Sequence, residues 1–161
     1  MRKLCLLVAV VALVGPARAS EDREAAHHHF PVHHVAVFVG GASEGRPRHA
    51  TEHGFAIGAE YEIRFAPRWG AGVLVEGVGQ ETVRDVVVLG LGSWHFGGGF
   101  RVVAGPGVEF GHHHDEFVFR LGVGYEIVSG TGFTVAPEIN VDLIGDEKTT
   151  WVYGLAFGKE F

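Results

Sequence analysis

The feature that most constrains this chain is a position-by-position alternation between apolar residues and small or polar residues, which runs from Val35 to the last residue. Between Phe55 and Phe65, for example, every odd position is apolar, whereas glycine, glutamate and arginine occupy the even positions from 58 to 64. A period of two is typical of a β-strand with two different faces, and no stretch shows the 3.6-residue period of an amphipathic helix. The sequence therefore predicts an all-β protein.

Turn-forming residues divide the alternation into eight segments. Their lengths are close to the roughly 9 to 11 residues that a tilted strand needs to cross the hydrocarbon layer of a membrane. The predicted strands are residues 34–41, 55–65, 69–77, 86–96, 100–110, 117–127, 133–143 and 151–161. The fourth is the least regular, because residues 86–89 are apolar on both faces. Pro106 and Pro137 fall inside strands, where we expect local bulges.

The two faces differ in a way that favours a membrane barrel over a water-soluble one. One face is large and aromatic from end to end, as contact with lipid requires, whereas glycine accompanies glutamate and arginine on the other. An eight-stranded barrel has an interior only just wide enough for side chains, so glycine beside a charge suits a crowded lumen. We therefore predict an eight-stranded antiparallel up-and-down transmembrane β-barrel with its charges inside.

The first nineteen residues have the composition of a secretory signal peptide. Arg2 and Lys3 precede a short apolar run, and the ending at residues 17–19 matches an A-x-A cleavage site. The run is shorter than the roughly 20 apolar residues of a transmembrane helix. We divide the chain into a signal peptide cleaved after Ala19 (residues 1–19), a short periplasmic segment (20–33) and a barrel domain (34–161).

Cleavage of this leader changes both the redox chemistry and the charge of the chain. It would remove Cys5, the only cysteine, and so leave a mature protein without disulfides. It would also leave 10 of the 13 basic residues against 19 acidic residues, a formal charge of −9. Because proteins that bind nucleic acid present basic surfaces, we expect no nucleic-acid partner.

Four segments of the chain resemble the small outer-membrane β-barrel proteins of the OmpA and OmpX type: residues 33–40, 58–65, 120–126 and 154–161. The resemblance extends over essentially the whole mature length and implies a place in the outer membrane of a Gram-negative cell, in contact with outer-membrane lipid. The last segment looks like the signal that the barrel-assembly machinery reads in such proteins. The residues of this signal begin just before that segment and are Trp151, Tyr153, Leu155, Phe157 and Phe161. We expect a monomer.

The inner face is predicted to carry a polar network of eight acids and three arginines. Its members are Glu60, Glu62, Arg64, Glu76, Arg101, Glu109, Arg120, Glu126, Glu138, Asp142 and Glu160. Pairing of neighbouring strands can set Arg101 opposite Glu126, and Arg120 beside Asn140 or Asp142. Since so narrow an interior leaves little free volume, we interpret the network as a plug that fixes strand register. An ion path or gate is the alternative.

Two other patterns would suit a catalytic site or a metal site, but their positions in the predicted barrel argue against both. Ser93 and His95 share a face, as in a lipid-modifying enzyme, but lie at the periplasmic end of their strand, and a charged lumen offers no pocket for an acyl chain. The eleven histidines are assigned to the periplasmic side (His27, His28, His29, His33, His34, His95) or to two outer loops (His49, His53, His112, His113, His114). Adjacent histidines in a short loop cannot all face one metal ion. We predict no catalytic residue, no cofactor and no metal.

The sequence thus favours a non-enzymatic outer-membrane barrel with a structural or surface-interaction role. A small porin-like permeability barrel is the alternative, and an outer-membrane lipid-modifying enzyme is a weaker one.

Overall fold

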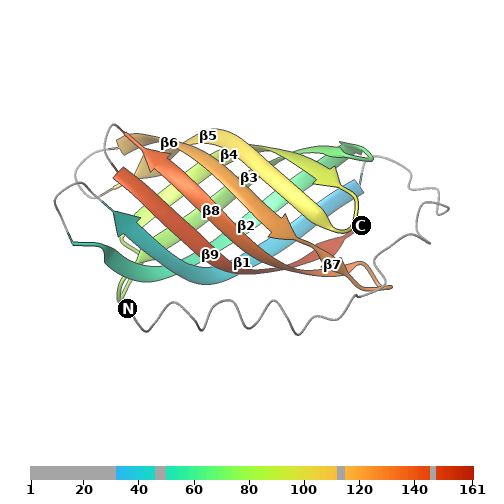
Figure 1. The fold of residues 1–161 in the computed structure, drawn as a ribbon, viewed down its shortest axis with the longest axis horizontal. Coiled ribbons are helices and arrows are strands. Elements are labelled where there is room, and N and C mark those ends of the chain that lie inside the picture. Colours follow the sequence, from blue (N-terminus) through green and yellow to red (C-terminus); the bar gives the residue numbers. More distant parts are fainter. Residues whose placement is uncertain (1–31, 46–49, 112–114, 146–147) are drawn as a thin grey trace.

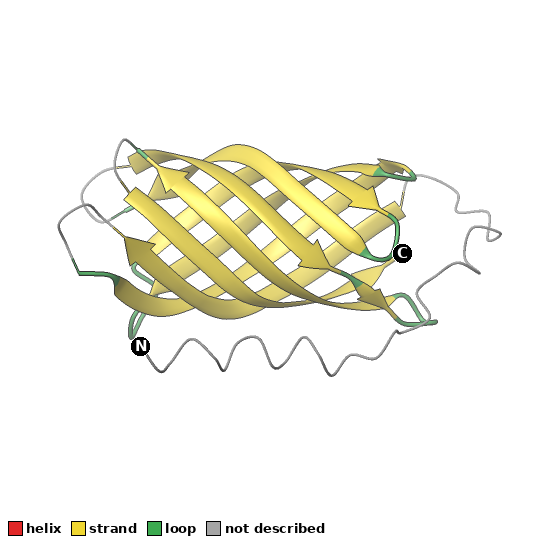
Figure 2. Cartoon of the chain, viewed as in Figure 1, coloured by secondary structure: helices red, strands yellow, loops and turns green. Residues whose placement is uncertain are grey.

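A computed structural model describes residues 32–45, 50–111, 115–145 and 148–161, and in it the chain forms a closed barrel of oblique antiparallel strands (Figures 1 and 2). The strands are β1 (Val32–Gly45), β2 (Glu52–Ala66), β3 (Trp69–Gly79), β4 (Asp85–Phe96), β5 (Phe100–Phe110), β6 (Asp115–Tyr125), β7 (Ile127–Val128), β8 (Phe133–Ile144) and β9 (Lys148–Glu160). No helix that is long and apolar enough to cross a membrane occurs in these residues. The predicted signal peptide lies outside them and stays a prediction.

The barrel wall has eight strands, as predicted. Each strand from β1 to β5 pairs with the next, β8 pairs with β6, β7 and β9, and β9 pairs with β1 to close the wall. The short β7 is the continuation of β6 beyond Glu126, because both segments pair with β8 in one register. A closed wall leaves no unpaired strand edge, which is what a sheet in lipid requires.

The two ends of the barrel differ, and we name them by their connections. At the turn end the chain enters at Val32 and leaves at Phe161, and the strands are joined by the turns 67–68, 97–99 and 129–132 (Figure 1). Gly98 and Gly99 have φ angles of 80° and 87°, which explains why glycine fills that turn. At the loop end the connections are 46–51, 80–84, 111–114 and 145–147.

The first strand is longer than predicted, and the loops at its far end are correspondingly shorter. The apolar alternation stops near Gly41, but backbone pairing continues on both sides, as far as Glu44 opposite Glu52 and Gly45 opposite Thr149. The strand also begins at Val32, two residues before the predicted barrel boundary. Both ends of this strand are set by backbone pairing with its neighbours, and the pattern of its side chains does not reveal that pairing.

The predicted bulge at Pro106 is wrong. Leu89 lies opposite Gly107 and Gly92 lies opposite Ala104, so β4 and β5 keep one register on both sides of the proline. The pairs between them, at Gly90 and Leu91, are the ones missing from the ladder. Proline has no N–H to donate to the opposite carbonyl, so a gap replaces a bulge.

At Pro137, too, the ladder has a gap where a bulge was predicted. This gap separates β6 from β7. Gly124 pairs with Glu138 and Ile127 pairs with Val135, which fixes one register across the interruption. Pro137 lies between these pairs and has no N–H for the facing strand. The wall strand therefore loses its ladder with β8 at residues 125–126, while Tyr125 still pairs with Phe100 on β5.

Candidate functional site

The candidate functional site is the charged interior of the barrel. All eleven residues predicted for the polar network take part in ion pairs across or within the lumen, and the strands alternate between these inward residues and exposed apolar ones. The four cations that join them, Arg64, Arg101, Arg120 and Lys148, each contact an acid on a strand that is not an immediate neighbour. The interior is thus tied together across its width and not only along each strand pair.

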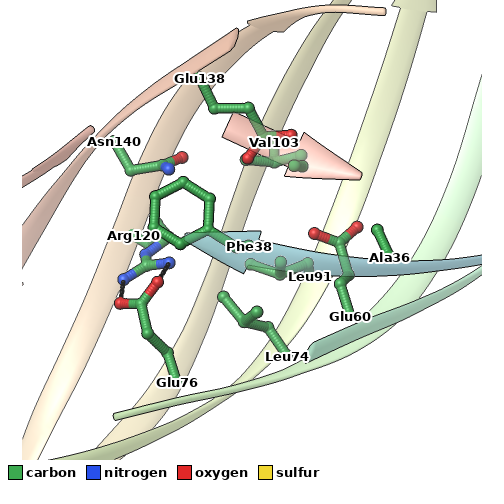
Figure 3. A pocket seen from close by; sticks show the side chains of 11 residues that line it. Ala36, Phe38, Glu60, Leu74, Glu76, Leu91, Val103, Arg120, Glu138 and Asn140 are labelled. Atoms are coloured by element: carbon green, nitrogen blue, oxygen red, sulfur yellow. Dashed lines mark hydrogen bonds and ion pairs between the residues drawn. The ribbon is translucent and has the colours of Figure 1, made fainter. Parts of the chain in front are cut away.

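A trio of charges occupies the middle of the barrel. Arg120 on β6 donates from Nε to Asp142 Oδ1 and from Nη2 to Asp142 Oδ2 on β8, both at 2.6 Å. Its Nη2 atom also lies 2.6 Å from Glu76 Oε1 on β3, on the other side of the lumen (Figure 3). The pairing with Asp142 is one of the two predicted for Arg120, whereas the contact with Glu76 could not be read from strand neighbours. All three side chains are buried.

A larger group, the turn-end cluster, surrounds Arg101 on β5. Its guanidinium contacts Glu60 and lies 3.3 Å from Glu62, both on β2. It also lies 3.5 Å from Glu138 on β8. The predicted partner, Glu126, is the most distant of the four, at 4.0 Å. The neighbouring-strand prediction therefore found a real but long contact and missed the tighter ones across the lumen.

Arg64 joins the remaining acids of the turn-end cluster. Its Nη2 atom donates to Glu126 at 2.7 Å, and its Nη1 atom donates to Glu160 at 2.8 Å. Because Glu160 on β9 lies opposite His34 on β1, this contact sits where the first and last strands close the wall. Arg64 therefore links the closure of the barrel to the interruption between β6 and β7.

The pair Ser93 and His95 belongs to the same cluster. Ser93 Oγ donates to Glu62 Oε1 at 2.7 Å, and His95 Nε2 lies 2.7 Å from the same oxygen. Both side chains thus meet a carboxylate on β2, and at the turn end, where the sequence placed them. Sequence reasoning did not identify Glu62 as their shared partner, because alternation gives the face of a residue but not its height in the barrel relative to residues two strands away.

A third group lies at the loop end and includes a lysine that the sequence analysis missed. Lys148 Nζ is 2.6 Å from Glu109 on β5 and 3.2 Å from Glu44 on β1. The predicted strands end at residue 143 and resume at residue 151, which leaves Lys148 in a connection between them. In the structure β9 begins at Lys148, which turns the side chain into the lumen, where it is buried.

Apolar side chains fill the space between these charged groups. Leu74, Val87, Leu89, Leu91, Val118 and Ile144 form one buried cluster, and Phe38 packs with small residues in a second. The lumen is therefore filled by apolar side chains as well as by charged ones, and the doubly apolar start of β4 supplies Val87 and Leu89 to the interior. A cavity beside Phe38 and Arg120 has a volume of about 10 Å³, the space of about one water (Figure 3).

The outer wall carries the predicted assembly residues. Trp151, Tyr153, Leu155, Phe157 and Phe161 are all exposed on the face opposite the lumen. At the turn end Phe161 exchanges two backbone hydrogen bonds with His33, at 3.0 and 2.9 Å, and the two rings are stacked. Trp69, Trp94, Phe96, Phe100 and Tyr125 form a further row of contacting rings around this end. Such rows mark the level of a membrane interface.

The histidines fall into two sets. His33, His34 and His95 lie at the turn end, and His53 lies at the loop end, hydrogen-bonded to Ser43 at 2.8 Å. His27, His28, His29, His49, His112, His113 and His114 lie outside the described residues. Within the described ranges, no group of three or more His, Cys, Asp or Glu residues could hold a metal ion. The absence of a metal site in the loops stays a prediction.

No protein-family model matches the chain, and no curated protein matches its sequence. Solved structures do match in fold. Ail, the attachment invasion locus protein of Yersinia pestis, superposes with a TM-score of 0.62 at 10% identity, over 81% of this chain and 99% of that one. Neisserial surface protein A (NspA) superposes with a TM-score of 0.58 at 8% identity, over 80% and 97% of the two chains.

The outer membrane protein OprG of Pseudomonas aeruginosa is a third structural neighbour, with a TM-score of 0.53 at 13% identity, over 81% of this chain and 97% of that one. The three neighbours are eight-stranded outer-membrane barrels. The chain therefore has the fold of the small outer-membrane β-barrels, as the resemblance to the OmpA and OmpX type implied. At these identities the likeness concerns the fold and not the activity.

Proposed function

We propose that this protein is a non-enzymatic outer-membrane barrel that acts as a structural element or through its exposed surface, and not as an open channel. The observation that carries the proposal is the layering of cross-lumen ion pairs: Arg101 at the turn end, Arg120 in the middle and Lys148 at the loop end. Each layer joins strands that are not neighbours, with apolar side chains packed between. Such an interior resists the passage of solutes.

The outer-membrane location is supported by the outer wall and by the neighbours. Rings cluster at the turn end, large apolar side chains cover the wall, and Ail, NspA and OprG are outer-membrane proteins. A barrel of this kind places its short turns in the periplasm and its loops outside. The loop end is therefore the surface that we expect to meet external partners.

The charge of the loop end limits the partners that suit a surface role. One Ail structure holds the heparin analogue sucrose octasulfate. At the loop end of this chain, the described residues that are charged are mostly acidic: Glu44, Glu52, Glu81, Asp85, Asp115 and Glu116 against Arg84 and Lys148. Because like charges repel, we propose that a polyanion of that type is not the partner here.

Labelling of single cysteines tests the location and the orientation. The chain has one cysteine, Cys5, in the predicted leader, so Thr82→Cys at the loop end and Gly130→Cys in a turn each give one reactive site in the mature protein. A maleimide that cannot cross the outer membrane should label Thr82→Cys on intact cells and Gly130→Cys only after permeabilisation. The reverse pattern, or no labelling of either variant on intact cells, would overturn the proposal.

A further inference from the structure

The interruption of the wall at Glu126 leaves the segment 125–132 with fewer ladder bonds than its neighbours. Pro137 cannot donate to this part of the wall, and the backbone N–H of Glu126 instead donates to Gly99 O at 2.7 Å, in the adjacent turn. Backbone pairing of Ile127 and Val128 joins the segment to β8, and the side chain of Glu126 is what joins it to β2 across the lumen. That carboxylate is buried.

Two basic side chains lie against the Glu126 carboxylate. Arg64 donates to its Oε2 atom at 2.7 Å, and His95 Nδ1 lies 3.5 Å from the same oxygen. The other ring nitrogen of His95, Nε2, lies 2.7 Å from Glu62 on β2. The imidazole thus stands between two carboxylates, one at each nitrogen.

This arrangement fits the imidazolium and does not fit the neutral ring. The imidazolium donates from both nitrogens, whereas neutral imidazole has one N–H donor and one acceptor nitrogen. On a neutral ring, the acceptor nitrogen would face a carboxylate oxygen, so one of the two contacts must be lost. The proton on His95 therefore decides whether Glu62 and Glu126 are joined through it.

The charges around His95 also favour the imidazolium over the neutral ring. His95 interacts with Glu62 and Arg64 from β2 and with Glu126 from the β6–β7 break, and the same cluster holds Glu60 from β2, Arg101 from β5, Glu138 from β8, Glu160 from β9 and His34 from β1. Five carboxylates thus meet two guanidiniums. A third positive charge reduces this imbalance, and loss of that charge increases the repulsion among the acids. His34 contributes a hydrogen bond to Thr134 instead, at 2.8 Å.

We propose that His95 is a pH-responsive latch: its imidazolium ties the segment 125–132 to β2, and release of the proton loosens that segment at the turn end. The latch has access to water, because the side chains of His95, Arg64 and Glu160 keep 12 to 14% of their surface exposed. Histidine is the side chain that changes charge between about pH 5 and pH 8. The device is a property of the barrel itself and is independent of the role proposed above.

Two measurements on the refolded full-length barrel in detergent micelles test the latch. The first is the NMR signature of the His95 ring, which should be that of an imidazolium at about pH 6. The second is amide hydrogen exchange, corrected for the intrinsic pH dependence of exchange. Amides of residues 125–132 should exchange about tenfold faster at pH 8 than at pH 5.5, while those in the middle of β5 do not change.

His95→Gln and a matched control separate the charge of the ring from its shape. Glutamine keeps a donor but cannot be charged, so His95→Gln should make exchange in the segment independent of pH. His53→Gln, at the loop end, should behave as the wild type. A neutral His95 ring at pH 6, wild-type exchange that does not change with pH, or the same pH dependence in His95→Gln would each overturn the proposal. If His95→Gln fails to fold, the two wild-type measurements still decide.

Discussion

Arg120 and Asp142 lie directly opposite one another on β6 and β8, and the guanidinium donates two parallel hydrogen bonds of 2.6 Å to the carboxylate. Glu76 reaches the same guanidinium from β3 across the lumen. A bidentate pair of this kind fixes register as well as charge balance. Through these three residues, ion pairs connect opposite sides of the barrel wall at the middle of the lumen.

Removal of the cation alone should destabilise this layer severely. In Arg120→Met, Glu76 and Asp142 would be left buried and uncompensated, so we expect a loss of about 3–5 kcal/mol in the free energy of unfolding. The triple variant Arg120→Met, Glu76→Gln, Asp142→Asn removes all three charges and should lose much less. Urea titration of the barrel in lipid vesicles measures both.

The exposed Arg84→Met at the loop end is the control, and its change should stay within about 0.5 kcal/mol. If the triple variant is as unstable as Arg120→Met, the cost does not come from unpaired charges and the account of the trio is wrong.

Inward glycines are expected to be irreplaceable where the lumen is fullest. A Cβ added at Gly122 would overlap Asn140 Oδ1 and lie 2.9 Å from Val103 Cγ2, so Gly122→Ala should destabilise the barrel by about 1–3 kcal/mol. Gly92→Ala, on the lipid-facing side of β4, meets nothing closer than Ala104 O at 3.7 Å and should be close to neutral. Equal losses for the two variants in urea titrations would show that crowding inside the barrel is not the cause.

The gap in the ladder at Pro106 should be reparable. Pro106→Ala supplies the N–H that the opposite strand lacks, and in lipid an unpaired backbone group costs several kcal/mol. Greater freedom of the unfolded chain offsets part of this gain, by about 0.4–1 kcal/mol. We expect a net stabilisation of about 1–2 kcal/mol in the same titration.

Pro67 lies in an exposed turn outside the ladder, so Pro67→Ala adds no ladder hydrogen bond and only increases the freedom of the unfolded chain. This variant should be slightly destabilising. The explanation fails if Pro106→Ala destabilises the barrel as Pro67→Ala does, or if its new amide at residue 106 is unprotected from hydrogen exchange.

The terminal aromatic should matter for assembly. Phe161 closes the wall through its two backbone hydrogen bonds to His33, and the family resemblance implies that the assembly machinery reads this residue. Deletion of Phe161, or Phe161→Ala, should lower the amount of inserted protein while export and signal cleavage continue. Fractionation with protease digestion of intact cells measures insertion. Phe133→Ala, an exposed ring at the same end, is the control, and wild-type insertion of the deletion variant would contradict an assembly signal here.

The pattern of the sequence was sufficient for the strands and for their faces. A period of two puts Glu62 and Arg64 on one face and Ile63 on the other whatever the neighbours are, so the inward charges could be named in advance. The same pattern does not say at what height along the barrel axis a residue lies relative to residues on other strands. Arg101 meets Glu60 and Glu62, three strands away around the wall, because of strand tilt and register, and these are set by the whole closed barrel.

Local composition misled the prediction in two places. Lys148 stands in a polar run that resembles a loop, but backbone pairing of β9 with β8 begins at that residue and directs its side chain inward. Val87 and Leu89 lie within an apolar stretch without alternation, so the inward face could not be chosen from sequence. In both cases the deciding information is the pairing with another strand, which is absent from the segment itself.

Electrical recording across a planar lipid bilayer tests the closed interior most directly. The three layers of cross-lumen ion pairs, with a cavity of only about 10 Å³ beside Arg120, predict that refolded protein, shown to be inserted, leaves the bilayer silent. A known channel protein reconstituted in the same membrane is the positive control. Steady open currents that appear only with this protein would contradict the account and favour a permeability role.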